Sequence, residues 1–180
     1  MIWFSSPFSP EKNLGKAYND FVRIIPNNSD WVCLTDLDTQ FLLPSTPVQL
    51  QQYIDKYPDT GLFTCLTNRV GTLDQCYGGV INEDPNILNH VKIARRLQSE
   101  NSLEVKEHNA LISGHLMMFR KDVWDRVGKF PEETGKMLGV DNRFSKRITR
   151  EGYKIRIMMG VYIFHYYRLE LGRFNKDHLK

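Results

Sequence analysis

The chain has 180 residues and the composition of a folded globular protein. Hydrophobic residues make up 41% of it and charged residues 25%, which excludes intrinsic disorder, collagen-like repeats and small disulfide-stapled folds. We expect a single domain over residues 1–180, because this length is typical of one hydrophobic core. No stretch approaches the roughly 20 apolar residues of a membrane span, and the first residues lack the features of a signal peptide. We therefore expect a cytoplasmic protein.

Charge is distributed unevenly along the chain. The net charge is +3, but residues 1–90 carry 5 basic and 10 acidic side chains, whereas residues 91–180 carry 19 and 11. The two halves therefore have charges of −5 and +8. The basic half would suit an anionic partner, although a solvated basic face is the more frequent explanation of any one cluster.

The order of apolar residues predicts strands that alternate with helices. Short apolar runs bounded by turn residues are typical of covered strands, and apolar residues at helical spacing are typical of amphipathic helices. Strands are predicted at residues 1–6, 30–35, 61–67, 111–119 and 154–166. Helices are predicted at residues 14–25, 47–56, 85–97, 121–127 and 141–151. This alternation predicts an α/β fold, a three-layer sandwich around a mixed sheet that is mostly parallel.

Two acids follow the second predicted strand. Asp36 and Asp38 come directly after the apolar run of residues 30–35. Ligands of open α/β sheets bind beyond the carboxyl ends of the strands, and residues two apart in extended backbone point the same way. Both carboxylates would then bind one divalent cation that also holds a diphosphate. A strand that simply ends in two solvated acids explains these two residues alone equally well.

The segments around these acids resemble, in order and spacing, the family-two-like glycosyltransferases of the GT-A fold. The matching segments are NLGKAYN (13–19), DWVCLTDLD (30–38), GHLMMFRK (114–121), VGKF (127–130), GVDNRF (139–144) and GY (152–153). Their order is the most specific feature of a similarity that runs through nearly the whole chain. The resemblance implies transfer of a sugar from a nucleotide-sugar, with a UDP-sugar favoured, to an acceptor hydroxyl. It also implies that the D-x-D acids hold Mn²⁺ or Mg²⁺.

The resemblance assigns roles to individual residues. Asp38 is expected to be the principal metal ligand, Asp36 to reach the metal or the donor ribose, and His165 to close the metal site. Asp141 matches the catalytic base, although Val140 stands where the family most often has Glu. A carboxylate in the first turn of a helix would be kept ionised by the helix dipole. The alternatives are a helix N-cap for Asp141 and a hydrogen-bonded core histidine for His165.

Five further residues are expected to bind or organise the donor. Pro7 and Phe8 lie where the first loop of the family meets the nucleotide, and Asn13 would organise that loop. Arg69 ends a predicted strand and would pair with phosphate, or else form a surface salt bridge. Gly114 opens one of the matching segments. The interval before the D-x-D motif is shorter than in full family members, so we expect an N-terminally reduced fold and cannot assign the donor sugar.

The acceptor and two competing functions remain open. A glycan and hydroxymethylated DNA are the acceptors considered, and inversion by single displacement is the rule in the family. The segment Asp36–Thr39 also resembles haloacid-dehalogenase-like phosphatases, but Gln40 stands where that pattern asks for Thr or Val. A non-catalytic nucleotide-sugar-binding module is the other alternative. The sequence does not indicate an oligomeric state.

Overall fold

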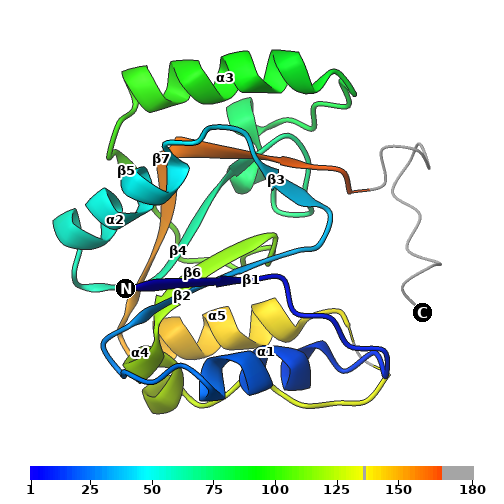
Figure 1. Cartoon of the computed structure of the whole chain (residues 1–180), viewed down its shortest axis with the longest axis vertical. Helices are drawn as coiled ribbons and strands as arrows, with labels where there is room; N and C mark the ends of the chain where they lie inside the picture. The colour runs from blue at the N-terminus through cyan, green and yellow to red at the C-terminus, as the bar shows by residue number, and fades with distance from the viewer. Residues whose placement is uncertain (136, 168–180) are drawn as a thin grey trace.

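The computed structural model describes residues 1–135 and 137–167 (Figure 1). This part of the chain is an α/β structure with a seven-stranded mixed sheet and five α-helices. In chain order, its elements are β1 (Ile2–Ser5), α1 (Leu14–Arg23), β2 (Trp31–Thr35), β3 (Thr39–Phe41), α2 (Thr46–Lys56), β4 (Thr60–Thr67), η1 (Leu73–Gln75), η2 (Tyr77–Gly79), α3 (Ile87–Glu100), β5 (Val105–Glu107), β6 (Leu116–Arg120), α4 (Lys121–Val127), α5 (Val140–Arg150) and β7 (Lys154–His165). Within the described residues, every helix is too short or too polar to cross a bilayer.

The sheet has the strand order β1-β2-β6-β4-β7-β3, and β5 also pairs with β7. Of its six strand pairings in the described residues, only β1–β2 and β4–β7 are parallel. The expectation of a mostly parallel sheet is therefore wrong. The reason is that β6 starts at the edge where β2 and β4 end, and a turn after β2 sends β3 back in the opposite direction. Even so, β1, β2, β4 and β7 all run in one direction.

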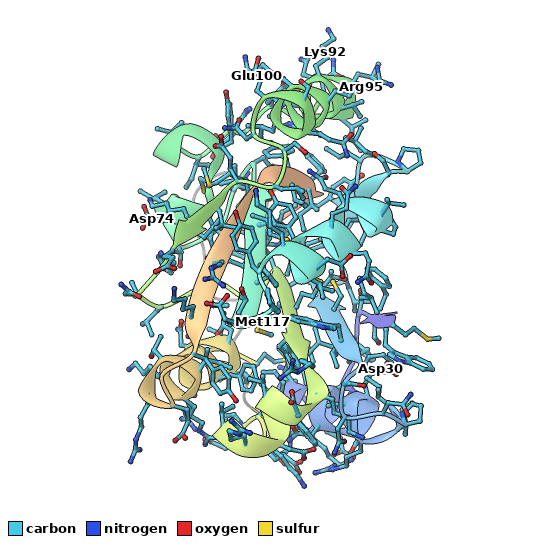
Figure 2. The ribbon with its side chains drawn as sticks, turned by 90° about the vertical axis from the view of Figure 1, so that its left-hand side faces the viewer. Asp30, Asp74, Lys92, Arg95, Glu100 and Met117 are labelled. Atoms are coloured by element: carbon cyan, nitrogen blue, oxygen red, sulfur yellow. The ribbon has the colours of Figure 1, made fainter. Side chains whose placement is uncertain are left out.

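Helices cover both faces of the sheet. In β2, Val32 and Leu34 pack in a core cluster with α1, α4 and α5, whereas Trp31 and Cys33 pack in another with α2. This alternation follows from the two-residue period of a strand. Figure 1 accordingly shows α1, α4 and α5 on one side of the sheet and α2 and α3 on the other, and Figure 2 shows Met117 in the interior between them.

Helix α3 starts later than the sequence suggests. Asn86 is its N-cap, with Oδ1 accepting the Leu88 N–H at 3.1 Å, so Pro85 precedes the helix. Leu88 is 66% exposed, whereas Ala94 and Leu97 are buried against β4 and β7. Three exposed side chains of α3 that Figure 2 labels are charged, namely Lys92, Arg95 and Glu100.

Strand β7 changes its register midway. Cys65 of β4 pairs with Met158, but the next residue, Leu66, pairs with Tyr162. Inside the shifted segment, the carbonyl of Gly160 accepts a hydrogen bond from the buried Gln49 side chain at 2.9 Å. The shift leaves the last residues of β7 aligned with the carboxyl end of β4.

Candidate metal and catalytic site

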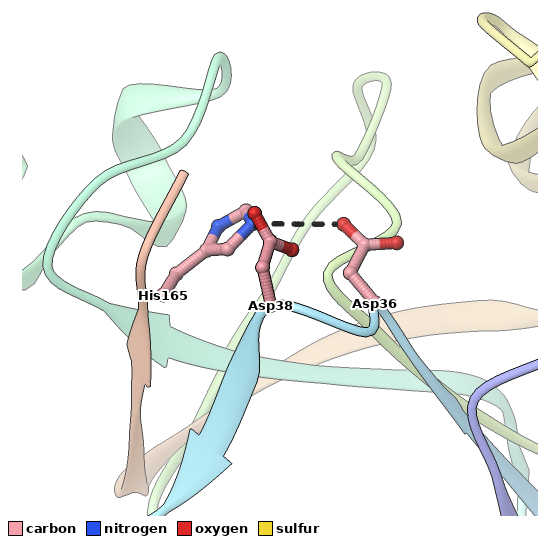
Figure 3. A group of neighbouring side chains, drawn as sticks. All are labelled: Asp36, Asp38 and His165. Atoms are coloured by element: carbon pink, nitrogen blue, oxygen red, sulfur yellow. Dashed lines mark ion pairs between the residues drawn. The ribbon is translucent and has the colours of Figure 1, made fainter. Parts of the chain in front are cut away.

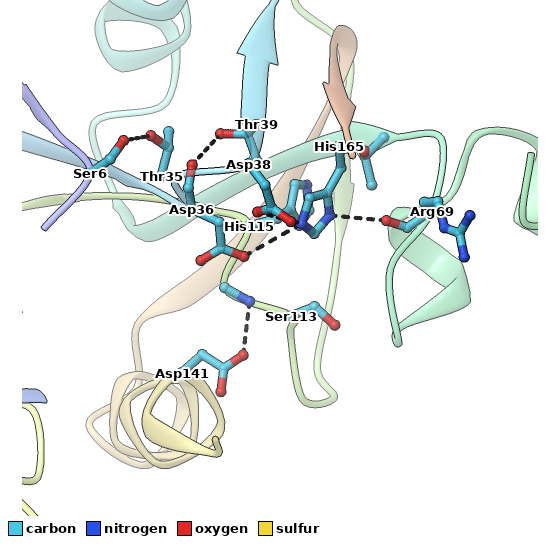
Figure 4. Close-up of polar contacts among 12 residues, drawn as sticks. Ser6, Thr35, Asp36, Asp38, Thr39, Arg69, Ser113, His115, Asp141 and His165 are labelled. Carbon is cyan, nitrogen blue, oxygen red and sulfur yellow. Dashed lines mark hydrogen bonds and ion pairs between the residues drawn. The ribbon is translucent and has the colours of Figure 1, made fainter. Parts of the chain in front are cut away.

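One edge of the sheet collects most of the predicted site residues. The strands β1, β2, β4 and β7 end there, and β6 begins there. Asp36 and Asp38 follow β2, His165 ends β7, and Gly114 lies just before β6. The first turn of α5 brings Asp141 to the same edge, since the Gly114 N–H donates to Asp141 Oδ2 at 2.8 Å (Figure 4).

Asp36 and Asp38 lie in a tight turn rather than in extended backbone. The Thr39 N–H donates to the Asp36 carbonyl at 3.2 Å, and the Thr39 hydroxyl donates to the same oxygen at 2.7 Å. Leu37, inside the turn, is 65% exposed, while the two carboxylates lie beside His165 (Figure 3). The prediction that strand alternation aligns the two acids is wrong, because the strand ends at Thr35 and the turn brings them together instead.

His165 presents one ring nitrogen to the two acids. Its Nδ1 lies 3.0 Å from the carbonyl oxygen of Arg69, which can only accept, so Nδ1 carries the proton. In the neutral ring, Nε2 then holds a lone pair 3.2 Å from Asp38 Oδ1 and 3.7 Å from Asp36 Oδ2. This nitrogen is buried, and none of the described residues forms a hydrogen bond with it. Three electron-rich groups therefore face one another, an arrangement that a cation stabilises.

The three side chains fit a divalent cation. One ligand atom from each of Asp36, Asp38 and His165 lies within 4.8 Å of the other two. Mn²⁺ accepts carboxylate oxygen together with imidazole nitrogen, whereas Mg²⁺ favours oxygen alone. A backbone carbonyl behind the histidine ring is a typical outer contact of a metal-binding histidine. Of the two predicted cations, the donor set suits Mn²⁺ better.

The two acids of this cluster differ in their protonation. Burial raises the pKa of Asp36 to about 6; the neighbouring His165 opposes this shift, and the charges of Asp38 and Asp141 add to it. Burial also acts to raise the pKa of Asp38, but the hydrogen bond and charge that His165 supplies in its protonated form, together with a backbone hydrogen bond and the charge of His115, hold this pKa below the usual carboxyl value. Asp38 therefore keeps its negative charge over a wider pH range than Asp36.

Asp141 is the second residue of α5, whose N-cap is Gly139, so the N-cap alternative for Asp141 is wrong. Its Oδ2 accepts the Gly114 N–H and its Oδ1 accepts the Asn142 N–H, both at 2.8 Å. Burial nevertheless raises the pKa of Asp141 above the usual carboxyl value, against the effect of these two N–H groups. The expectation that the helix dipole keeps Asp141 ionised is therefore corrected, because burial has the larger effect on its pKa.

Two cavities meet at the cluster. One of about 410 Å³ is lined by Asp36, His165 and Asp141, and a second of about 270 Å³ by Asp36, Asp38 and His165. Because Asp36 and His165 line both, the cavities adjoin at the candidate metal site. Their combined size is in the range of small-molecule binding sites, roughly 300–1,000 Å³.

The residues predicted to contact the nucleotide lie at the second cavity. Pro7 and Phe8 are part of its lining. Asn13 is buried beneath this loop: its Oδ1 accepts the Lys16 N–H at 3.1 Å as the N-cap of α1, and its own N–H donates to Ser9 Oγ at 2.9 Å. This placement corresponds to the organising role expected of Asn13.

Arg69 does not bring its side chain to the site. Its guanidinium is buried, lines neither cavity and points away from the acids in Figure 4. The nearest acid is Glu83, with Oε1 3.8 Å from Arg69 Nη2. The salt-bridge alternative therefore holds in part, as an ion pair between a buried guanidinium and an exposed carboxylate, and Arg69 also contributes its carbonyl to His165.

Three residues that the sequence did not single out also build the site. Tyr18 of α1 lines both cavities. Gln75 is fully buried and binds the main chain of Ser113 twice, with Nε2 donating to its oxygen at 3.0 Å and Oε1 accepting its N–H at 2.7 Å. Asn68 binds the main chain of His165 in the same way. An isolated Asn or Gln in a short connecting segment gives no sequence signal for such a role.

Comparison with known proteins leaves the site to be interpreted from its own residues. No family model matches the chain, and no curated protein matches its sequence.

Proposed function

We propose that this protein is a metal-dependent glycosyltransferase of the GT-A type, N-terminally reduced, that transfers a sugar from a nucleotide-sugar to an acceptor hydroxyl. One observation carries the proposal: a cavity of about 410 Å³ has in its walls two members of the three-residue cation cluster, Asp36 and His165, and a separate carboxylate, Asp141. A cation site beside an acid with a raised pKa is the combination that diphosphate departure and hydroxyl activation require together.

The donor would bind across the two cavities. Asp36, Asp38 and His165 hold the cation, and Pro7 and Phe8 supply apolar surface to the nucleotide. When bound, the cation supplies charge neutralisation for the departing nucleoside diphosphate. A UDP-sugar is the donor we favour.

Asp141 is the proposed general base. The acceptor oxygen attacks the anomeric carbon, the bond from that carbon to the diphosphate breaks with its electron pair leaving on the phosphate, and the hydroxyl proton passes to the Asp141 carboxylate. The Gly114 and Asn142 N–H groups fix both carboxylate oxygens, so their remaining lone pairs keep a set direction. The raised pKa makes Asp141 a stronger base than an exposed aspartate. A single displacement of this kind inverts the sugar.

The acceptor is proposed to be a glycan or hydroxymethylated DNA, in the cytoplasm. The basic half of the chain contributes Lys146 and Arg150 on α5, the helix that carries Asp141. An acceptor that is a polyanion would therefore approach a positive surface, and transfer to it would weaken as ionic strength rises.

A panel of nucleotide-sugars with Mn²⁺ tests the function. We expect a UDP-sugar to raise the melting temperature of the wild-type protein only when Mn²⁺ is present, and to be slowly hydrolysed. Asp38→Asn should remove both effects, because it deletes a ligand oxygen and a negative charge. Differential scanning fluorimetry and release of nucleoside diphosphate provide the two readouts.

Two outcomes would contradict the proposal. Metal-dependent cleavage of p-nitrophenyl phosphate without any response to nucleotide-sugars would favour the phosphatase alternative. Binding of a nucleotide-sugar with no hydrolysis or transfer, unchanged in Asp141→Asn, would favour the non-catalytic module.

A further inference from the structure

The side chain of Asn68 extends the pairing between β4 and β7 beyond the last residue of β4. The ladder ends with Thr67 opposite Ile163. Asn68 is fully buried, and its Oδ1 accepts the His165 N–H at 2.7 Å while its Nδ2 donates to the His165 carbonyl at 3.0 Å. One planar amide thus satisfies both main-chain groups of His165, as a neighbouring strand would.

The following residue fixes the ring of the same histidine. The Arg69 carbonyl accepts the Nδ1 proton of His165 at 3.0 Å, which sets both the tautomer and the ring orientation. Residues 68 and 69 therefore hold the main chain and the side chain of His165 together. What they leave free is Nε2, the buried atom beside Asp36 and Asp38.

We infer that Asn68 is a positioning residue for the divalent cation: it holds the main chain of His165 so that Nε2 faces Asp36 and Asp38. The inference rests on the metal site of the proposed function. An amide is required because the role needs one donor and one acceptor on the same short side chain. Alanine has neither, serine is too short to reach both groups, and glutamine adds a methylene to a side chain that is fully buried.

A buried amide elsewhere on β7 provides a matched control. Gln49, 4% exposed, also donates to the β7 main chain, at Gly160 with a distance of 2.9 Å. Removing the Gln49 side chain would weaken the attachment of β7. The attachment point, Gly160, lies five residues before His165 along the chain, and Gln49 forms no hydrogen bond with His165. Gln49→Ala therefore reports the effect of losing a contact to β7 and one to Gln98, neither of which involves His165.

Mn²⁺ titration followed by electron paramagnetic resonance tests the inference, because the signal of free Mn²⁺ disappears on binding. We expect Asn68→Ala to weaken Mn²⁺ binding about tenfold or more, as is typical when an outer contact of a metal ligand is lost. Gln49→Ala should bind Mn²⁺ like the wild type. In a His165→Ala background, Asn68→Ala should have no further effect, because a positioning residue acts only through its ligand. Asn68→Ser serves as the milder variant if Asn68→Ala does not fold.

The outcomes separate this inference from the function on which it rests. Equal Mn²⁺ affinity of the wild type and a folded Asn68 variant would overturn the inference and leave the metal site standing. The same tenfold loss in the presence and absence of the His165 ring would also overturn it, since a general loosening of the fold would then be the cause. A folded wild-type protein that binds no Mn²⁺ would overturn the metal site and this inference together.

Discussion

At the scale of single residues, the site depends on main-chain groups that hold acidic side chains at fixed positions. Asp141 accepts one N–H from its own helix and one from Gly114, in a segment far away along the chain. A Cβ atom on Gly114 would lie 2.9 Å from the Asp141 Cβ, so only glycine allows this approach. The segment before β6 thereby fixes the proposed base relative to the sheet.

Asp141→Asn should abolish most turnover while leaving donor and Mn²⁺ binding intact. The amide cannot accept a proton from the acceptor, and loss of a general base typically costs about 10²–10⁴-fold in rate. Steady-state kinetics should show the loss in kcat with little change in the KM of the donor. In the wild type, kcat should decline on acidification with an apparent pKa above the usual carboxyl value, because burial raises the pKa of Asp141.

Asp122→Asn provides the matched control for this substitution. Asp122 also lies in the first turn of a helix, α4, but it pairs with Arg120 and lines neither cavity. The turnover of the Asp122→Asn variant should equal that of the wild type. If Asp141→Asn and Asp122→Asn had equal rates, another residue would have to accept the proton.

Residue patterns in the sequence predicted the acids and the histidine but not the groups that orient them. Asp36 and Asp38 stand out because they directly follow a strand pattern, whereas Asp141 and His165 were assigned from the resemblance to a known family. The roles of Asn68 and Gln75 depend on which distant main-chain groups lie within hydrogen-bond distance, and this is decided only when the sheet assembles. Arg69 shows the same limit, since local position alone could not reveal that its guanidinium points inward.

At the scale of elements, β7 organises the edge of the sheet. Two short strands share one of its sides: β5 pairs with its first half and β3 with its last residues. Both strands have three residues and no clear alternation, which explains why sequence patterns did not predict them. Arg156, whose side chain is 5% exposed, joins β7 to its surroundings by pairing with Asp59 at 2.7 Å and with Glu107 of β5 at 3.4 Å.

Asp59→Asn should reduce the stability of the fold at neutral pH. It should also make that stability less dependent on pH in the acidic range. The hydrogen bond from Arg156 is the main reason that the pKa of Asp59 is lowered to about 2. A lowered carboxyl pKa stabilises the fold above the ordinary value near 3.8, and this contribution disappears as pH falls from about 4 to 2. Since Asp59 is half exposed, solvent screening limits the loss to about 1 kcal/mol.

Urea denaturation at pH 7 and pH 2.5 measures both parts of this prediction. The stability difference between the wild type and Asp59→Asn should be clear at pH 7 and small at pH 2.5. Asp55→Asn, which changes an exposed acid of α2 whose Oδ1 accepts a hydrogen bond from Gln51 Nε2 at 2.8 Å, should follow the wild type at both values. A difference that grows on acidification would contradict the assigned sign.

At the scale of the whole molecule, the site lies where two layers meet. The sheet supplies the candidate metal cluster, and the helical layer supplies Asp141 through α5. The alternation of strand and helix patterns was sufficient to predict this layered α/β arrangement and the sheet edge that carries the acids. The direction of β6 was not predictable, because the strands on either side of it, β2 and β4, are distant in sequence. Antiparallel insertion of β6 is nevertheless what brings Gly114 to the same edge.

Mn²⁺ should therefore couple the site to the stability of the entire fold. Because burial raises the pKa of Asp36 to about 6, the metal-free folded protein binds a proton that the unfolded chain releases near the ordinary value of 3.8. Stability without metal should fall as pH rises from about 4 to 6 and then level off. Mn²⁺ at about 100 times its Kd should add about 2.7 kcal/mol above pH 6.

Thermal melts of Asp36→Asn in EDTA and in Mn²⁺ separate the two contributions. At pH 7.5 in EDTA, this variant should melt above the wild type, because it removes a partly buried charge close to Asp38 and Asp141. It should lose the increase that Mn²⁺ gives. Asp38→Asn should lose the same increase without the gain in EDTA, since the His165 ring lowers the pKa of Asp38 and its charge is already stabilised. If both variants gained equally in EDTA, the two acids would not differ in protonation as the geometry around His165 requires.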